Sequence, residues 1–140
     1  MIDVELGALL ADASQAAAYF IDVRDRAAVV EAANALEFHV ATANLETAGD
    51  KAALLWEIAA ALEFPGDFGA NWDALADSLG DLSWLPAPGY VLLLDHCADL
   101  REAAPADFAT LLEILDEVAR AHAGQGVPFW AVLPLASADA

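Results

Sequence analysis

Three acidic residues, Asp73, Asp77 and Asp81, follow one another at intervals of four in a stretch without lysine or arginine. In a helix this spacing places their side chains on one face. Like charges at this spacing destabilise a helix by about 0.2–0.5 kcal/mol per pair, and the helix dipole offsets only the charge nearest the N-terminus. Because such a local conflict often marks a functional site, we interpret the carboxylates as a recognition face for a cationic partner. The alternative is an ordinary solvated face of an acidic protein.

The residues around this acidic row predict a loop followed by a short helix. Pro65, Gly66 and Gly69 interrupt regular structure, because proline lacks a backbone donor and glycine admits positive φ. Asn71 is expected to cap the helix N-terminus, and Gly80 is expected to be the left-handed residue at its C-terminal end. The predicted helix also carries an apolar stripe at i, i+3 and i+7 that should face a core, formed by Trp72, Leu75 and Leu79.

Hydrophobic patterns along the rest of the chain predict strands that alternate with helices. The expected strands are 19–23, 38–45, 90–94 and 127–133, and the expected helices are 4–16, 25–36, 49–62, 71–80 and 105–123. Asp25 and Pro105 are suitable residues for the starts of two of these helices. Strands joined through helices form right-handed crossovers, so we predict an α/β fold with a small parallel or mostly parallel sheet flanked by helices.

Length and charge restrict the class of protein. The 140 residues suit one domain, and the net charge of −18 repels nucleic acid phosphates and attracts basic partners. No apolar run reaches the roughly 18 residues that a membrane span requires. Cys97 is the only cysteine, so no intrachain disulfide can form, and acidic residues stand near Met1 where a targeting signal would be basic. We therefore expect a cytoplasmic protein that binds neither membranes nor nucleic acid directly.

The pattern Phe-Gly-x-Asn-x-Asp-Ala-Leu-x-Asp-x-Leu, from Phe68 to Leu79, resembles the barstar family of ribonuclease inhibitors. Trp72 and the segment 82–86 resemble the broad bacterial branch of that family. The resemblance covers about residues 38–133 and implies the same α/β architecture. We expect one domain over 1–140, in which residues 37–135 form the barstar-like core and residues 1–36 add a strand-helix extension at the sheet edge.

The resemblance also implies a binding site for a basic ribonuclease, in which carboxylates occupy the place of the RNA phosphate. The partner-binding residues that it implies are Asp67, Phe68, Gly69, Asn71, Asp73, Ala76, Asp77 and Glu117. Asp67 and Ala76 stand where the family has aromatic residues, and aromatic residues commonly carry interface energy. Trp72 and Trp84 would replace them only if exposed. These differences favour a basic partner other than barnase itself.

Other chemistry has weaker support in the sequence. Asp95, His96 and Cys97 are consecutive at a strand end, so their side chains should point in different directions rather than form a catalytic triad. His39 and His122 are interpreted as structural residues, and no metal-ligand spacing or phosphate-binding loop predicts a metal or cofactor. Two hypotheses stay open: a ribonuclease inhibitor or immunity protein, and a non-inhibitory module that binds another basic protein. An enzyme that uses the Asp73 and Asp77 carboxylates is a third, less favoured hypothesis.

Overall fold

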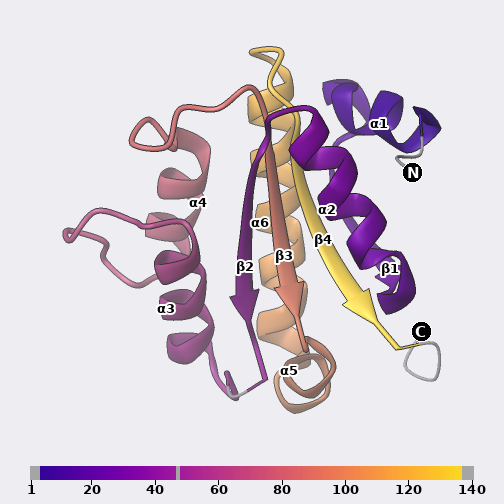
Figure 1. The fold of residues 1–140 in the computed structure, drawn as a ribbon. Coiled ribbons are helices and arrows are strands. Elements are labelled where there is room, and N and C mark those ends of the chain that lie inside the picture. The colour runs from indigo at the N-terminus through magenta and orange to yellow at the C-terminus, as the bar shows by residue number, and fades with distance from the viewer. Residues whose placement is uncertain (1–3, 47, 137–140) are drawn as a thin grey trace.

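The computed structural model describes residues 4–46 and 48–136, which form an α/β fold around a parallel sheet (Figure 1). Its strands are β1 (Ala18–Asp22), β2 (His39–Asn44), β3 (Tyr90–Asp95) and β4 (Phe129–Leu135), in the order β1-β4-β3-β2. All neighbouring pairs are parallel. The central strands β3 and β4 are buried along almost their whole length, as their continuous apolar sequences predict. The predicted parallel sheet is confirmed.

Helices cover both faces of the sheet. They are α1 (Val4–Ala11), α2 (Arg26–Ala35), α3 (Lys51–Ala61), α4 (Trp72–Asp81), α5 (Ala98–Ala103) and α6 (Pro105–Ala123), with short 3₁₀ turns at Ala13–Gln15 and Val23–Asp25. In Figure 1, α2 lies in front of the sheet and α6 behind it, while α3 and α4 lie beyond the β2 edge. None of the helices in the described ranges is long and apolar enough to cross a bilayer.

The predicted helix starts are mostly correct. The Asn71 side chain accepts a hydrogen bond from the Ala74 N–H at 2.8 Å, and Pro105 is the first residue of α6. Asp25 does precede α2, but its side chain makes no capping bond. The expected single helix over residues 4–16 is interrupted at Asp12, because the Asp12 carboxylate accepts from the Ser14 N–H and starts a separate 3₁₀ turn.

The helix end predicted at Gly80 is wrong. Gly80 lies inside α4, and the left-handed residue is Leu82, with φ of 50°. Leu82 is only 1 % exposed, so burial of its side chain accounts for a backbone conformation that a branched residue otherwise avoids. Tertiary packing therefore determines where α4 ends.

The first 36 residues add an edge strand and a covering helix, as the sequence predicts. β1 pairs with β4, and two long-range bonds fix its surroundings: the Trp130 indole N–H donates to the Leu10 carbonyl at 2.9 Å, and the Ala18 N–H donates to the Asp116 carboxylate at 2.9 Å. Arg26 of α2 forms a bidentate ion pair with Asp95 at the end of β3, at 2.9 and 2.8 Å. The division at residues 36 and 37 and the count of one domain stay predictions.

Two glycine-to-alanine substitutions should change stability in opposite directions. A Cβ at Gly89 would lie 2.6 Å from the buried Phe38 ring, so Gly89→Ala should destabilise the fold by about 1–3 kcal/mol. Gly80 lies inside α4 with open space around it, so Gly80→Ala should stabilise the fold by up to about 1 kcal/mol. Urea unfolding of both variants tests this expectation, and a stabilised Gly89→Ala or a destabilised Gly80→Ala would contradict it.

Candidate functional site

The loop between α3 and α4 turns sharply, but not at its glycines. Glu63 and Ala70, near its two ends, have φ of 53° and 51°. The sequence analysis assigned this conformational role to Gly66 and Gly69, which is wrong, since neither has a positive φ. Left-handed backbone costs a non-glycine residue about 1–2 kcal/mol. The loop therefore holds strained positions on both sides of its exposed tip, an arrangement that is common at binding sites.

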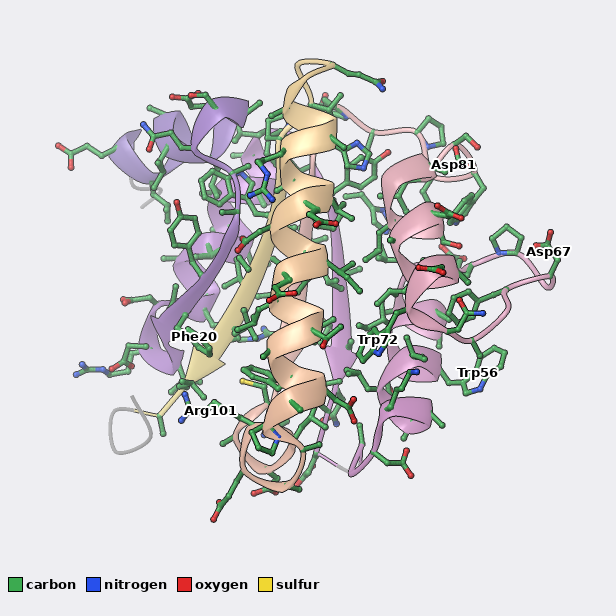
Figure 2. All side chains as sticks on the ribbon, turned by 180° about the vertical axis from the view of Figure 1, so that it is seen from behind. Phe20, Trp56, Asp67, Trp72, Asp81 and Arg101 are labelled. Atoms are coloured by element: carbon green, nitrogen blue, oxygen red, sulfur yellow. The ribbon has the colours of Figure 1, made fainter. Side chains whose placement is uncertain are left out.

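The acidic helix α4 has one buried side and one exposed side. Leu75 and Leu79 are fully buried, and Trp72 is half-buried on the side toward α6 (Figure 2). This confirms the predicted apolar stripe. Asp73 and Asp77 are exposed, so packing leaves both carboxylates in solvent.

The acidic residues of the loop and helix are not neutralised by ion pairs within the described part of the chain. Asp67, Asp73, Asp77 and Asp81 are exposed, and none forms an ion pair with a described lysine or arginine. Lys51 of α3 lies close to the start of α4, with its Nζ 5.2 Å from the centre of the Trp72 ring. The four carboxylates therefore present their negative charge to solvent.

The remaining predicted site residues lie in the loop, on α4 and on α6. Gly69 and Asn71 are exposed in the loop, and Phe68 is half-buried beside them. Ala76 is half-buried and packs against the core. Glu117 is exposed on α6, the helix that packs against α4 through a 2.8 Å hydrogen bond between the His122 ring and the Leu79 carbonyl.

An aromatic cluster that the sequence analysis did not identify supports the loop. The Phe68 ring centre lies 5.0 Å from that of Phe64 and 5.5 Å from that of Trp56, both edge to face. Phe64 in turn lies 5.8 Å from Trp84, whose indole N–H donates to the Leu62 carbonyl at 2.9 Å. Trp84 is therefore engaged inside the protein, as Trp72 is, and Trp56 is the exposed member of the cluster.

Helical periodicity could have identified Trp56. The inward positions of α3 include Leu54, Leu55 and Ile58, and Trp56 lies between them on the outer side of the helix. It is 54 % exposed, more than any other large hydrophobic side chain in the described ranges. Figure 2 shows Trp56 and Asp67 on the outer side of the α3 and α4 region, away from α6.

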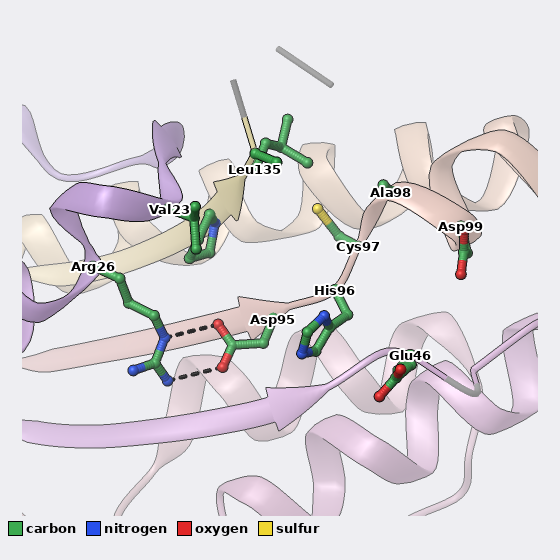
Figure 3. A pocket seen from close by; sticks show the side chains of 11 residues that line it. Val23, Arg26, Glu46, Asp95, His96, Cys97, Ala98, Asp99 and Leu135 are labelled. Carbon is green, nitrogen blue, oxygen red and sulfur yellow. Dashed lines mark hydrogen bonds and ion pairs between the residues drawn. The ribbon is translucent and has the colours of Figure 1, made fainter. Parts of the chain in front are cut away.

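A hollow of about 420 Å³ lies at the carboxyl ends of the strands (Figure 3). It brings Asp95, His96 and Cys97 to one place, but the Asp95 carboxylate is held by Arg26, and the Cys97 and His96 side chains point to opposite sides of the strand end. A catalytic triad requires a nucleophile that is hydrogen-bonded to a base, and a third group that orients the base. These three side chains do not form such a series. Within residues 4–46 and 48–136, no group of three or more His, Cys, Asp or Glu side chains could hold a metal ion.

Comparison with known proteins gives one family. The family model described as Barstar (barnase inhibitor) matches residues 38–134, which is more than half of the chain and includes the whole loop and α4. No curated protein matches the sequence. The matched range begins just before β2 and ends within β4, so β1 and α2 lie outside it. From this match, the chain belongs to the barstar family, a family of barnase inhibitors.

Proposed function

We propose that this protein inhibits a basic ribonuclease by covering its active site with the loop 66–71 and helix α4. The observation that carries this proposal is the pair of exposed carboxylates, Asp73 and Asp77, on a helix whose other side is fixed in the core. Family membership supports an inhibitory rather than an enzymatic role.

The chemistry of a ribonuclease active site explains why carboxylates suit this role. Such a site gathers cationic side chains to stabilise a phosphoryl group, and a carboxylate presents the same kind of oxygen acceptors as a phosphate. Asp73 and Asp77 offer these oxygens from one helix face, while Asp67 extends the negative surface into the loop. Inhibition then requires only that RNA be kept out.

The net charge acts at a longer range. A charge of −18 attracts a basic protein before contact, and the same field repels RNA. Glu117 on the neighbouring helix α6 extends this negative field around α4. We propose that Glu117 lies at the rim of the interface.

A second candidate function is a non-inhibitory module that binds another basic protein. The observation that favours it is the composition of the recognition surface, where an exposed acid, Asp67, and a half-buried alanine, Ala76, replace aromatic residues of the family pattern. For the same reason we propose a ribonuclease other than barnase as the inhibited enzyme.

Parallel capture experiments distinguish these functions. The wild-type protein and an Asp73→Ala/Asp77→Ala variant are immobilised, exposed to lysate of the source organism, and the retained proteins are identified by mass and assayed for RNA cleavage. We expect a basic ribonuclease on the wild-type protein alone, inactive until it is released. A retained basic protein without ribonuclease activity would support the interaction module instead, and identical sets on both proteins would exclude α4 as the recognition surface.

Single substitutions should separate the recognition face from the general charge. Asp77→Ala is expected to weaken binding of the retained ribonuclease by about tenfold or more, because it removes charge-assisted hydrogen bonds. Asp99→Ala removes an exposed carboxylate of α5 and should have little effect. Surface plasmon resonance at two salt concentrations measures both, and added salt should slow association of all variants. Equal losses for both substitutions would contradict a dedicated acidic face.

The cap at Asn71 should matter through the stability of α4. Asn71→Ala removes the acceptor for the Ala74 N–H and should lower the free energy of unfolding by about 1 kcal/mol, whereas Asn71→Asp keeps an acceptor. Urea unfolding compares the two variants with the wild type. If Asn71→Asp retains stability yet binds the ribonuclease poorly, the amide itself contacts the partner, and unchanged stability in Asn71→Ala would show that the cap contributes nothing.

A further inference from the structure

We propose that Trp56, with the hollow beside it, receives an arginine side chain of the basic partner and acts as an aromatic contact of the interface. This inference rests on the proposed function, because the partner is the ribonuclease, and it adds a residue that neither the sequence motif nor the family match assigns. The observation behind it is an exposed tryptophan, Trp56, next to the loop 66–71, the recognition loop of the proposed interface (Figure 2).

The lining of the hollow is mostly apolar and includes one acidic residue. The hollow has a volume of about 220 Å³ and lies between α3 and the start of the loop. Its lining includes three aromatic residues, Trp56, Phe64 and Phe68, together with the small Ala60 and the acidic Glu63. Aromatic side chains suit a group with flat apolar faces, and an acidic residue suits a group with a positive charge. The hollow therefore suits a group that has both properties.

A guanidinium group meets these requirements better than an ammonium group. It stacks on an aromatic face, it is weakly hydrated, and it pairs with a carboxylate through two parallel hydrogen bonds. Tryptophan is the strongest aromatic acceptor for a cation. Trp56 and Glu63 together therefore provide a face and a counter-charge for one arginine.

Lys51 and Arg101 lie over aromatic rings other than that of Trp56. Lys51, the basic residue nearest in sequence, has its Nζ 5.2 Å from the centre of the Trp72 ring. No lysine or arginine follows until Arg101, which lies over the Phe20 ring at 5.7 Å. Trp56 is thus an exposed aromatic ring in a strongly negative region, and among the described residues no lysine or arginine lies over it.

The hollow is continuous with the proposed interface. The Trp56 ring contacts Phe68, which belongs to the recognition loop, and Phe64 connects this contact to Trp84 and its fixed hydrogen bond. A partner that covers the loop tip at Asp67 therefore reaches Trp56 without crossing the core. The position also compensates for Asp67 and Ala76, since Trp56 supplies an aromatic contact from α3 instead of from the loop and α4.

A peptide titration tests the inference without a known partner. Acetyl-Arg-Gly-Arg-amide is added to the isotope-labelled protein, and the indole N–H signals are followed by NMR; the matched peptide contains citrulline, which has the same shape and no charge. The Trp84 and Trp130 indoles donate inside the protein and serve as internal references. We expect the arginine peptide to shift the Trp56 signal and the citrulline peptide not to do so. A Trp56 signal that is unmoved, or moved equally by both peptides, would overturn the inference.

Binding to the retained ribonuclease provides the second readout. Trp56→Leu keeps apolar surface but removes the aromatic face, and should weaken binding by about tenfold, whereas Trp56→Phe should lose less. Phe20→Leu is the matched control, because Phe20 is an exposed aromatic residue at the opposite edge of the sheet, on β1. Thermal unfolding confirms that each variant is folded.

The outcomes separate the inference from the proposed function. If the wild type inhibits a ribonuclease and Trp56→Leu binds it equally well, the inference fails and the proposed function stands. If Trp56→Leu weakens binding and Phe20→Leu does not, the inference is supported. If no ribonuclease is retained, the proposed function fails, and the peptide titration alone decides whether the hollow binds arginine.

Discussion

The hydrogen bond between the His122 ring and the Leu79 carbonyl, 2.8 Å long, holds the acidic helix in place. A carbonyl oxygen only accepts, so the ring Nε2 carries the proton and donates it. Leu79 lies in the last turn of α4, where carbonyl groups lack a partner within the helix. The same ring stacks on Phe129 at 5.5 Å and lies 5.8 Å from Tyr90. One buried side chain of α6 thus connects α4 to both central strands, and this role agrees with the structural interpretation of His122.

Firm attachment explains how α4 tolerates its own charges. Burying a leucine side chain contributes about 1.5–3 kcal/mol, and Leu75 and Leu79 are both fully buried. The repulsion between Asp73 and Asp77, at about 0.2–0.5 kcal/mol, is small beside this gain, and exposure to solvent screens it further. The core therefore supplies enough stability to present carboxylates that the helix alone disfavours. One side of α4 can present exposed carboxylates because packing of the opposite side determines the position of the helix.

Sequence patterns predicted many of the features that depend on neighbouring residues, though not the break at Asp12, and missed those that depend on distant ones. Continuous apolar strands, the Asn71 cap and Pro105 at the start of α6 are local, and all are confirmed. The left-handed residue that ends α4 is Leu82 and not the predicted Gly80. Leu82 is buried in a core that is built by residues far away in sequence. The outward position of Trp56 was accessible from helical spacing. The contact between Trp56 and Phe68 could not be predicted from helical spacing. It depends on the path of the loop, and the residues of that loop with positive φ are not glycines.

The extension before β2 stabilises the sheet from the edge opposite the proposed recognition surface. An unpaired β4 edge would expose a row of backbone donors and acceptors, and β1 satisfies it by parallel pairing. The partly exposed Arg26–Asp95 ion pair adds at most about 1 kcal/mol, but its bidentate geometry fixes α2 against the end of β3. Because β1 and β2 are at opposite edges, the extension leaves α3, the loop and α4 uncovered (Figure 1). A segment outside the family match can thus strengthen the fold without closing the surface on which a basic partner would bind.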